Sequence, residues 1–253
     1  MISILPIIFG GKSIALAHQT NPIQLRTLNT PTTLPYSLIF DCDGVIVDSE
    51  IVAVRVALRK MEPLGLKVSL EDYSHKYAGH KEHEILSMIT AEHGIEFPPN
   101  FLPEVNQDIR TAMVEELEPI KGMPELLKEL PTTLSVVSNS NVPHVQQSLQ
   151  LAGVADLFGE RIFSADHVEK AKPHPDVYLL AFKELGYDPA TTLVVEDSIA
   201  GVTAAKAAGA TVVGFLGASH IYDGHGEKLR ELGVDFLAED ANSLREILLS
   251  WKP

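Results

Sequence analysis

Cysteine and positive charge are both scarce in this chain. Cys42 is the only cysteine among 253 residues, which excludes an intrachain disulfide and leaves the redox compartment open. Lysine and arginine number 20 against 34 aspartates and glutamates, giving a net charge of −14. That balance disfavours nucleic acid as a partner, because such affinity comes largely from neutralised phosphates. A phosphorylated small molecule is compatible with it if a metal and a lysine reverse the field locally.

A hydrophobic run long enough to cross a membrane is also missing. The stretch from Met1 to Ala17 is mostly apolar, but Pro6 and Lys12 interrupt it, so we expect no membrane span. Ala15-Leu16-Ala17 resembles a signal cleavage site, yet no basic residue precedes the apolar part, which disfavours export. We expect residues 1–35 to be a poorly defined N-terminal extension or a misassigned start, and the protein to be cytoplasmic.

The same segment contains Gly10-Gly11-Lys12-Ser13, which matches the end of a phosphate-binding P-loop. That loop needs a further glycine where Pro6 stands, so we set the match aside. The ordinary content of apolar residues, 45%, and of charged residues, 21%, fits a globular chain. A length of 253 residues allows one α/β domain with a smaller inserted domain.

Apolar strand-like runs alternate with helical patterns after residue 36. Glycines 153, 186, 209 and 233 stand where helices should end. This alternation predicts a Rossmann-like, three-layered α/β core with a parallel sheet. The expected strands are Ser37–Asp41, Leu134–Ser138, Arg161–Ser164, Thr192–Glu196, Thr211–Phe215 and Asp235–Leu237. The expected helices are Pro143–Ala152, Pro175–Leu185, Ile199–Ala208, Gly226–Leu232 and Ala241–Leu249.

One long interval contains no strand pattern. Residues 49–118 look helical throughout, with apolar periodicity in Ile51–Met61 and Glu82–His93. We therefore predict a separate helical domain over 49–118, inserted into a core made of 36–48 and 119–253. Two linkers, near 48–52 and 116–122, would join it to the core.

The richest stretch of the chain runs from Leu38 to Glu50. An apolar strand ends in Asp41 and Asp43, and Gly44 then turns the backbone. Strand side chains alternate, so the two carboxylates should point one way and Cys42 the other. Such a pair suits a hard cation such as Mg²⁺, with one carboxylate attacking phosphorus and the other moving protons. An EF-hand is excluded because Val45 and Ile46 occupy positions that need a ligand and a glycine.

Three later segments supply what a phosphoryl-transfer site requires. Ser138, at the end of a strand and followed by Asn139, offers a hydroxyl and a backbone N–H to phosphate oxygens. Lys172 stands before Pro173 and Pro175 and offers compact positive charge. A buried-type strand then ends in Glu196 and Asp197, a second acidic pair suited to Mg²⁺. Ligands of open α/β sheets collect beyond these strand ends.

Together these segments resemble the four motifs of the haloacid dehalogenase superfamily, in the family's order. The first motif, Asp-x-Asp-Gly-x-x-x-Asp, is matched through Asp48. The resemblance implies a Mg²⁺-dependent enzyme in which Asp41 becomes an aspartyl phosphate and Asp43 is the general acid and base. Ser138, Asn139 and Lys172 would bind the phosphate. Asp41, the Asp43 carbonyl and Asp197 would hold the metal, with Glu196 supporting them through a water, and the insert would be a C1-type cap.

Branches of that superfamily differ at single positions. Asp43 argues against a dehalogenase, and residues 49–58 contain no lysine that would serve a phosphonate hydrolase. A β-phosphoglucomutase carries a histidine twelve positions after the nucleophile, where this chain has Ala53. The spacing of Asp43 and the insert also speak against a receiver-type phosphoacceptor.

The resulting hypothesis is a phosphatase of a small phosphorylated metabolite, a sugar or sugar-acid phosphate. A phosphosugar mutase and a non-catalytic binding protein of the same fold stay open as alternatives. In the cap, His80, Lys81 and Glu50 are expected to contact the substrate. No nucleic acid or membrane partner is expected, and the protein is expected to be a monomer or a weak homodimer.

Overall fold

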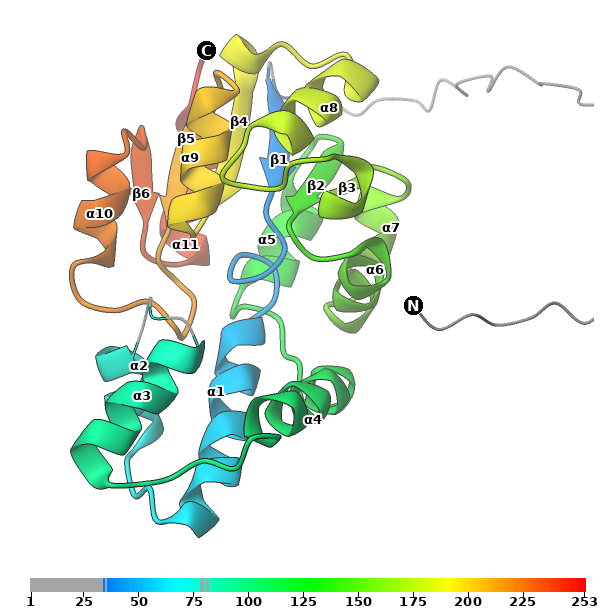
Figure 1. Ribbon diagram of the computed structural model, residues 1–253. Coiled ribbons are helices and arrows are strands. Elements are labelled where there is room, and N and C mark those ends of the chain that lie inside the picture. The colour runs from blue at the N-terminus through cyan, green and yellow to red at the C-terminus, as the bar shows by residue number, and fades with distance from the viewer. Residues whose placement is uncertain (1–33, 35, 78–79, 81) are drawn as a thin grey trace, which may run out of the picture. The chain divides into compact units, whose positions relative to one another are not determined.

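Short apolar segments form a parallel sheet of six strands in the computed structural model (Figure 1), which describes residues 34, 36–77, 80 and 82–253. The strand order is β3-β2-β1-β4-β5-β6. The strands are β1 (Ser37–Phe40), β2 (Leu134–Ser138), β3 (Ile162–Ser164), β4 (Thr192–Glu196), β5 (Thr211–Phe215) and β6 (Phe236–Ala238). The extension predicted for residues 1–35 lies outside the described residues, apart from Leu34.

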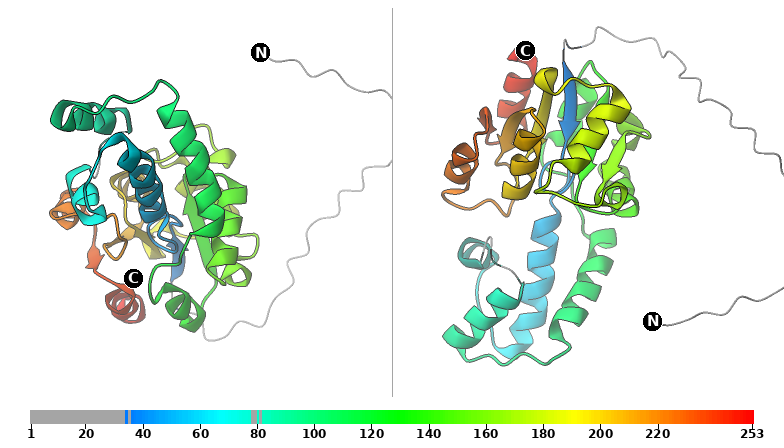
Figure 2. Two further views of the ribbon diagram at one scale, coloured as in Figure 1. Left: turned by 90° about the horizontal axis from the view of Figure 1, so that it is seen from below. Right: turned by 45° about the horizontal axis from the view of Figure 1, so that its top comes forward.

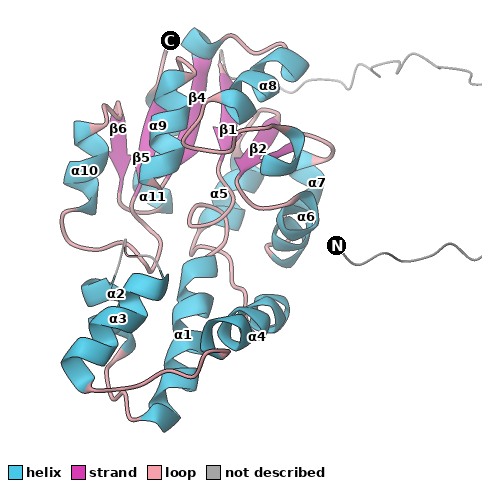
Figure 3. Ribbon diagram, in the orientation of Figure 1, coloured by secondary structure: helices cyan, strands magenta, loops and turns pink. Residues whose placement is uncertain are grey.

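Helices cover both faces of this sheet (Figure 3). Ile39 and its neighbours Val137 and Val194 pack in one hydrophobic cluster with α8 (Asp176–Leu185), α9 (Ile199–Ala207) and α10 (His225–Glu231). Leu38 and Phe40 belong to the opposite cluster, with α5 (Met123–Glu129), α6 (Val142–Leu151), α7 (Ala155–Phe158) and α11 (Ala241–Ser250). Alternating side chains thus bury both faces of the strands, which confirms the three-layered α/β core.

The interval between β1 and β2 is helical, as the sequence indicates. It contains α1 (Ser49–Met61), a 3₁₀ turn (Glu62–Leu64), α2 (Leu70–Tyr77), α3 (Glu82–His93) and α4 (Phe101–Glu115), followed by α5. Figure 2 shows α1 (blue) and α4 (green) side by side, and these two helices pack against each other. A separate hydrophobic cluster around Tyr73, Tyr77, Ile89 and Phe101 holds these helices together. The helical insertion is confirmed, whereas its domain limits, 49 and 118, remain a prediction.

Most element boundaries differ from the sequence-based expectation by one or two residues. The largest departures are α5 and α7, two short helices that the patterns did not indicate. With seven and four residues, they are too short to show an apolar period, and packing on the sheet stabilises them instead. Within the described part of the chain, no helix is both long and apolar enough to cross a membrane.

The sheet order places the chemically important strand ends together. β1 lies between β2 and β4, with Phe40 opposite Val136 on one side and Val195 on the other. All three strands are parallel, so their carboxyl ends meet at the same edge of the sheet. The residues that end or follow these strands, Asp41, Ser138 and Glu196, therefore converge.

Candidate active site

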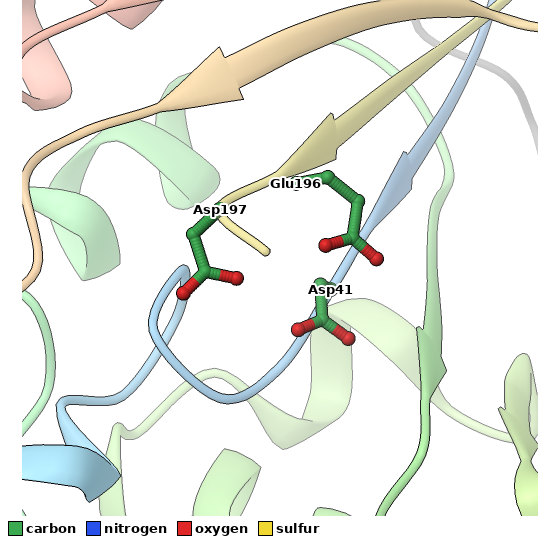
Figure 4. Close-up of side chains that lie close together, drawn as sticks. All are labelled: Asp41, Glu196 and Asp197. Carbon is green, nitrogen blue, oxygen red and sulfur yellow. The ribbon is translucent and has the colours of Figure 1, made fainter. Parts of the chain in front are cut away.

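Three buried carboxylates meet at the end of β1 and β4. Oxygens of Asp41, Glu196 and Asp197 all lie within 4.8 Å of one another, and Figure 4 shows the three side chains facing a common space. Their relative exposures are only 7%, 0% and 3%. Burial raises the pKa of Asp41 well above its usual value, and the charge of Glu196 adds to this shift while Lys172 opposes it.

Lys172 is the cation of this cluster. Its Nζ donates to Asp41 Oδ1 at 2.7 Å, to Glu196 Oε1 at 2.6 Å and to the Val137 carbonyl at 2.8 Å. Burial works against its charge, but the carboxylates of Asp41 and Glu196 outweigh burial and raise the Lys172 pKa. The ammonium thus contacts two of the three carboxylates, and the third, Asp197, adds to the negative charge of the cluster.

Glu196 is held by protein groups on both of its oxygens. Oε1 also accepts a hydrogen bond from Tyr178 Oη at 2.7 Å, and Oε2 accepts one from the Ser198 hydroxyl at 3.2 Å. A Cβ at Gly201 would lie 1.9 Å from the Glu196 carboxyl, so only glycine leaves room for it. The Ser198 hydroxyl also accepts from the Gly201 N–H, which caps α9.

Asp43 lies in the same cavity but has a separate set of partners. Its Oδ2 accepts a hydrogen bond from the Ser140 hydroxyl at 2.6 Å and a longer one from Ser138 at 3.5 Å. Its Oδ1 lies 3.1 Å from His144 Nε2. Burial opposes ionisation of Asp43, but the hydrogen bonds from His144 and Ser140 outweigh it and lower the Asp43 pKa. Asp43 is therefore more acidic than Asp41.

The Ser138 and Asn139 segment is tied to the Lys172 loop. The Asn139 amide accepts a hydrogen bond from the Lys172 N–H at 2.9 Å and donates one to the Lys172 carbonyl at 3.1 Å. Because the Asn139 side chain is engaged in this way, any phosphate contact from this residue falls to its backbone N–H. Ser138, Asn139 and Lys172 all line one cavity of about 400 Å³ with Asp41 and Asp43. We call this space the catalytic cavity.

The residues present suit a divalent cation. Asp197 Oδ1 is buried and has no hydrogen-bond partner among the described residues, which is costly unless a ligand fills the gap. The excess negative charge around Asp41 favours a cation there. Gly44, with a φ of 76°, brings its backbone so close that a Cβ would lie 1.9 Å from Asp197 Oδ2. The acidic pocket therefore needs glycine at position 44, and one of its carboxylate oxygens, Asp197 Oδ1, has no hydrogen bond from the described residues.

Sequence patterns did not reveal two histidines at this site. His144 contacts Asp43, and His220 Nε2 lies 3.1 Å from Asp197 Oδ2. For His144 a signal existed, because Asn141 and Pro143 mark a helix start just beyond the β2 strand end and place it in the first turn. His220 follows β5 in a loop, and no local spacing links it to Asp197.

A second cavity, of about 420 Å³, adjoins the first and shares Glu50, Ser198 and His220 with it. Its walls come from the helical insertion and from the loop after β5. Glu50 and His80, both expected to contact substrate, line this outer cavity. Lys81 lies outside the described residues. Glu50 is exposed to the cavity, yet the surrounding protein desolvates it and raises its pKa.

Comparison with known proteins agrees with this geometry. Residues 38–215 match the haloacid dehalogenase-like hydrolase family. A 6-phosphogluconate phosphatase of Escherichia coli is 28% identical over 73% of this chain and 84% of that protein. A phosphorylated carbohydrates phosphatase of Thermotoga maritima is 30% identical over 84% and 99%. A hydrolase of the family from Deinococcus radiodurans, solved with bound phosphate and sodium, is 30% identical with a TM-score of 0.73, over 84% of this chain and 94% of that one.

The chain belongs to the haloacid dehalogenase-like hydrolase family, since the match covers more than half of its length. Its C1-type helical insertion places it with the sugar phosphatases and β-phosphoglucomutases of that family. The prediction of an enzyme, a phosphatase-type hydrolase of this family, is confirmed.

Proposed function

We propose that this protein is a Mg²⁺-dependent phosphatase that hydrolyses a sugar or sugar-acid phosphate through an aspartyl phosphate on Asp41. The observation that carries the proposal is the contact of Lys172 Nζ with both Asp41, at 2.7 Å, and Glu196, at 2.6 Å, beside the buried Asp197. A nucleophilic carboxylate, a buried cation and a metal-binding acid occupy one cavity there.

Asp41 is the nucleophile in this proposal. Lys172 favours the ionised Asp41 carboxylate and so opposes the burial that raises the Asp41 pKa, and it also attracts the substrate phosphate. Ser138 and Asn139 line the same cavity, where the Ser138 hydroxyl and the Asn139 backbone N–H would bind phosphate oxygens. Glu196 holds Lys172 in place, since its oxygens are already engaged by Lys172, Tyr178 and Ser198.

Asp43 is the general acid and base. The hydrogen bonds from Ser140 and His144 orient its carboxyl at the cavity wall. The protonated carboxyl, a strong donor because the Asp43 pKa is lowered, would protonate the departing oxygen, and the carboxylate left behind would accept a proton from the attacking water. General acid–base catalysis of this kind contributes roughly 10²- to 10⁴-fold in rate.

Asp41 and Asp197 would hold the metal ion, with the Asp43 carbonyl and with Glu196 as the outer support. When bound, Mg²⁺ neutralises charge on the substrate phosphate and on the carboxylates around it. The free Oδ1 of Asp197 and the excess negative charge support this assignment.

The outer cavity is where the rest of the substrate would lie. Glu50 stands at its junction with the catalytic cavity and follows Ser49, which lines the catalytic cavity together with Asp43. A carboxylate in that place accepts hydrogen bonds from substrate hydroxyls, and His80 and Lys81 are further candidates for contact. The names of the Escherichia coli and Thermotoga maritima relatives point to phosphorylated carbohydrates.

Phosphate release from a panel of esters tests the function. The panel holds sugar phosphates, polyol phosphates and phospho-acids, with and without Mg²⁺, and EDTA as the control. We expect release from a few carbohydrate esters only when Mg²⁺ is present. Interconversion of sugar-phosphate isomers without release would favour the mutase alternative. Ester binding with neither reaction would favour a binding protein and contradict the proposal.

A further inference from the structure

The loop between β5 and α10, residues 216–224, reaches back to the metal-binding acid. It begins at the carboxyl end of β5, the edge of the sheet where the site lies (Figure 1). Two histidines at and just after this loop contact the same residue. His220 Nε2 lies 3.1 Å from Asp197 Oδ2, and His225 Nε2 lies 2.6 Å from the Asp197 carbonyl.

His225 Nε2 donates a hydrogen bond to the Asp197 carbonyl, which is an acceptor. His220 Nε2 contacts the Asp197 carboxylate, also an acceptor, and is the nitrogen that would donate to it. The Nδ1 atoms of His220 and His225 are buried without a partner among the described residues, which agrees with the proton lying on Nε2. Asp197 is thus fixed at its main chain and at Oδ2, and only Oδ1 is left free.

The loop itself is also anchored at the start of the helical insertion. Asp48 Oδ2 accepts hydrogen bonds from both the N–H and the hydroxyl of Ser219. Asp48 is the residue that precedes α1, at the start of the helical insertion. His225 is 5% exposed and packs edge-on against Tyr222, with ring centroids 5.0 Å apart. His220 therefore lies between two fixed residues of the chain, Ser219, which is bonded to Asp48, and the buried His225.

We infer that His220 is a positioning residue, which holds the Asp197 carboxylate so that its Oδ1 faces the metal ion. The Ser219–Asp48 contact keeps the His220 ring in reach of Asp197. An acid that rotates freely loses entropy when it binds a metal, so fixing it beforehand strengthens binding, and removing such an outer partner typically costs 10- to 100-fold in metal affinity. The inference rests on the magnesium site of the proposed function.

Calorimetric titration of the full metal-free chain with Mg²⁺ tests this role. We expect His220→Phe, which keeps a ring but removes the donor, to weaken Mg²⁺ binding about 10- to 100-fold. His220→Gln, which places an amide N–H near the position of Nε2, should stay within about threefold of the wild type, since the hydrogen bond is retained. His80→Phe is the matched control, because His80 is an exposed histidine of the outer cavity, and it should leave Mg²⁺ affinity unchanged.

Thermal unfolding in EDTA verifies that each variant is folded. Should His220→Phe fail to fold, Ser219→Ala carries the test, because Ser219 is exposed and the change removes one of the two hydrogen bonds that hold the loop at Asp48; we expect weaker Mg²⁺ binding. Equal affinity of the wild type and the folded His220→Phe or Ser219→Ala variant would overturn the inference. Tight, His220-dependent Mg²⁺ binding with no phosphate release from any ester would instead contradict the proposed function and leave the role of His220 intact.

Discussion

The catalytic cavity and the outer cavity differ in how firmly their polar side chains are held. In the catalytic cavity, Lys172 makes three hydrogen bonds and is 7% exposed. In the outer cavity, Glu50 and His80 are exposed, and the contact of His80 Nδ1 with Glu84 is local, at 3.7 Å and four positions apart. Fixed groups suit chemistry that needs preorganised charge, whereas exposed groups are available to a substrate.

A change in the catalytic cavity, where the polar side chains are held firmly, should have the largest effect on stability and turnover. Lys172→Met leaves Asp41 and Glu196 buried without their cation, and breaking a buried ion pair costs about 3–5 kcal/mol. We expect that loss in the free energy of unfolding, together with loss of turnover. Urea denaturation and phosphate release measure the two effects. Lys170→Met, an exposed lysine of the same segment, should change neither, and a stable, active Lys172→Met would contradict the account.

Changes at Glu50 should alter recognition of the substrate and leave the phosphoryl-transfer reaction itself intact. Glu50→Gln weakens hydrogen bonds to substrate hydroxyls, and we expect kcat/KM for the best carbohydrate ester to fall about 10-fold or more, as for other lost charged hydrogen bonds. The rate with 4-nitrophenyl phosphate, which has no hydroxyls, should stay the same.

Glu125→Gln removes the same charge from the first turn of another helix, α5, at a residue that lines neither cavity, and serves as the control. Equal losses with both esters in Glu50→Gln would show that Glu50 supports the chemistry itself.

The stability of the helical insertion should also depend on pH, through Tyr73, and this should be the smallest of these effects. Burial raises the pKa of Tyr73 to about 12 from 10.0. The folded state therefore disfavours the ionised phenol, and stability is lost as the pH rises from about 10 towards 12. At pH 11, Tyr73→Phe should avoid a loss of about 1.4 kcal/mol that the wild type suffers. Urea unfolding at pH 8 and 11 measures it, and an equal loss in both proteins would contradict the assignment.

The fold and the meeting of the candidate site residues were largely predictable because their signals are local. Asp41, Ser138 and Glu196 each end or follow an apolar strand, and parallel strands bring such ends together. The sequence indicated Lys172 because Pro173 and Pro175 follow it closely. The specific pairing of these side chains was not predictable, because Tyr178 reaches Glu196 only through the packing of α8 on the sheet.

Tertiary contacts account for what the sequence did not reveal. Ser219 lies 171 positions from Asp48, and His220 approaches Asp197 only because the loop after β5 is held there. Neither residue shows a spacing that a motif would use. The substrate contacts of the insertion are the least predictable, because exposed polar side chains such as His80 have no required partner within the chain.

Acid quench of the enzyme during turnover of its best ester tests the nucleophile most directly. Mass spectrometry of the quenched wild type should show a phosphate adduct on Asp41, formed only with Mg²⁺. Asp41→Asn should show no adduct and no phosphate release while remaining folded. Retained phosphate release by Asp41→Asn would contradict the account.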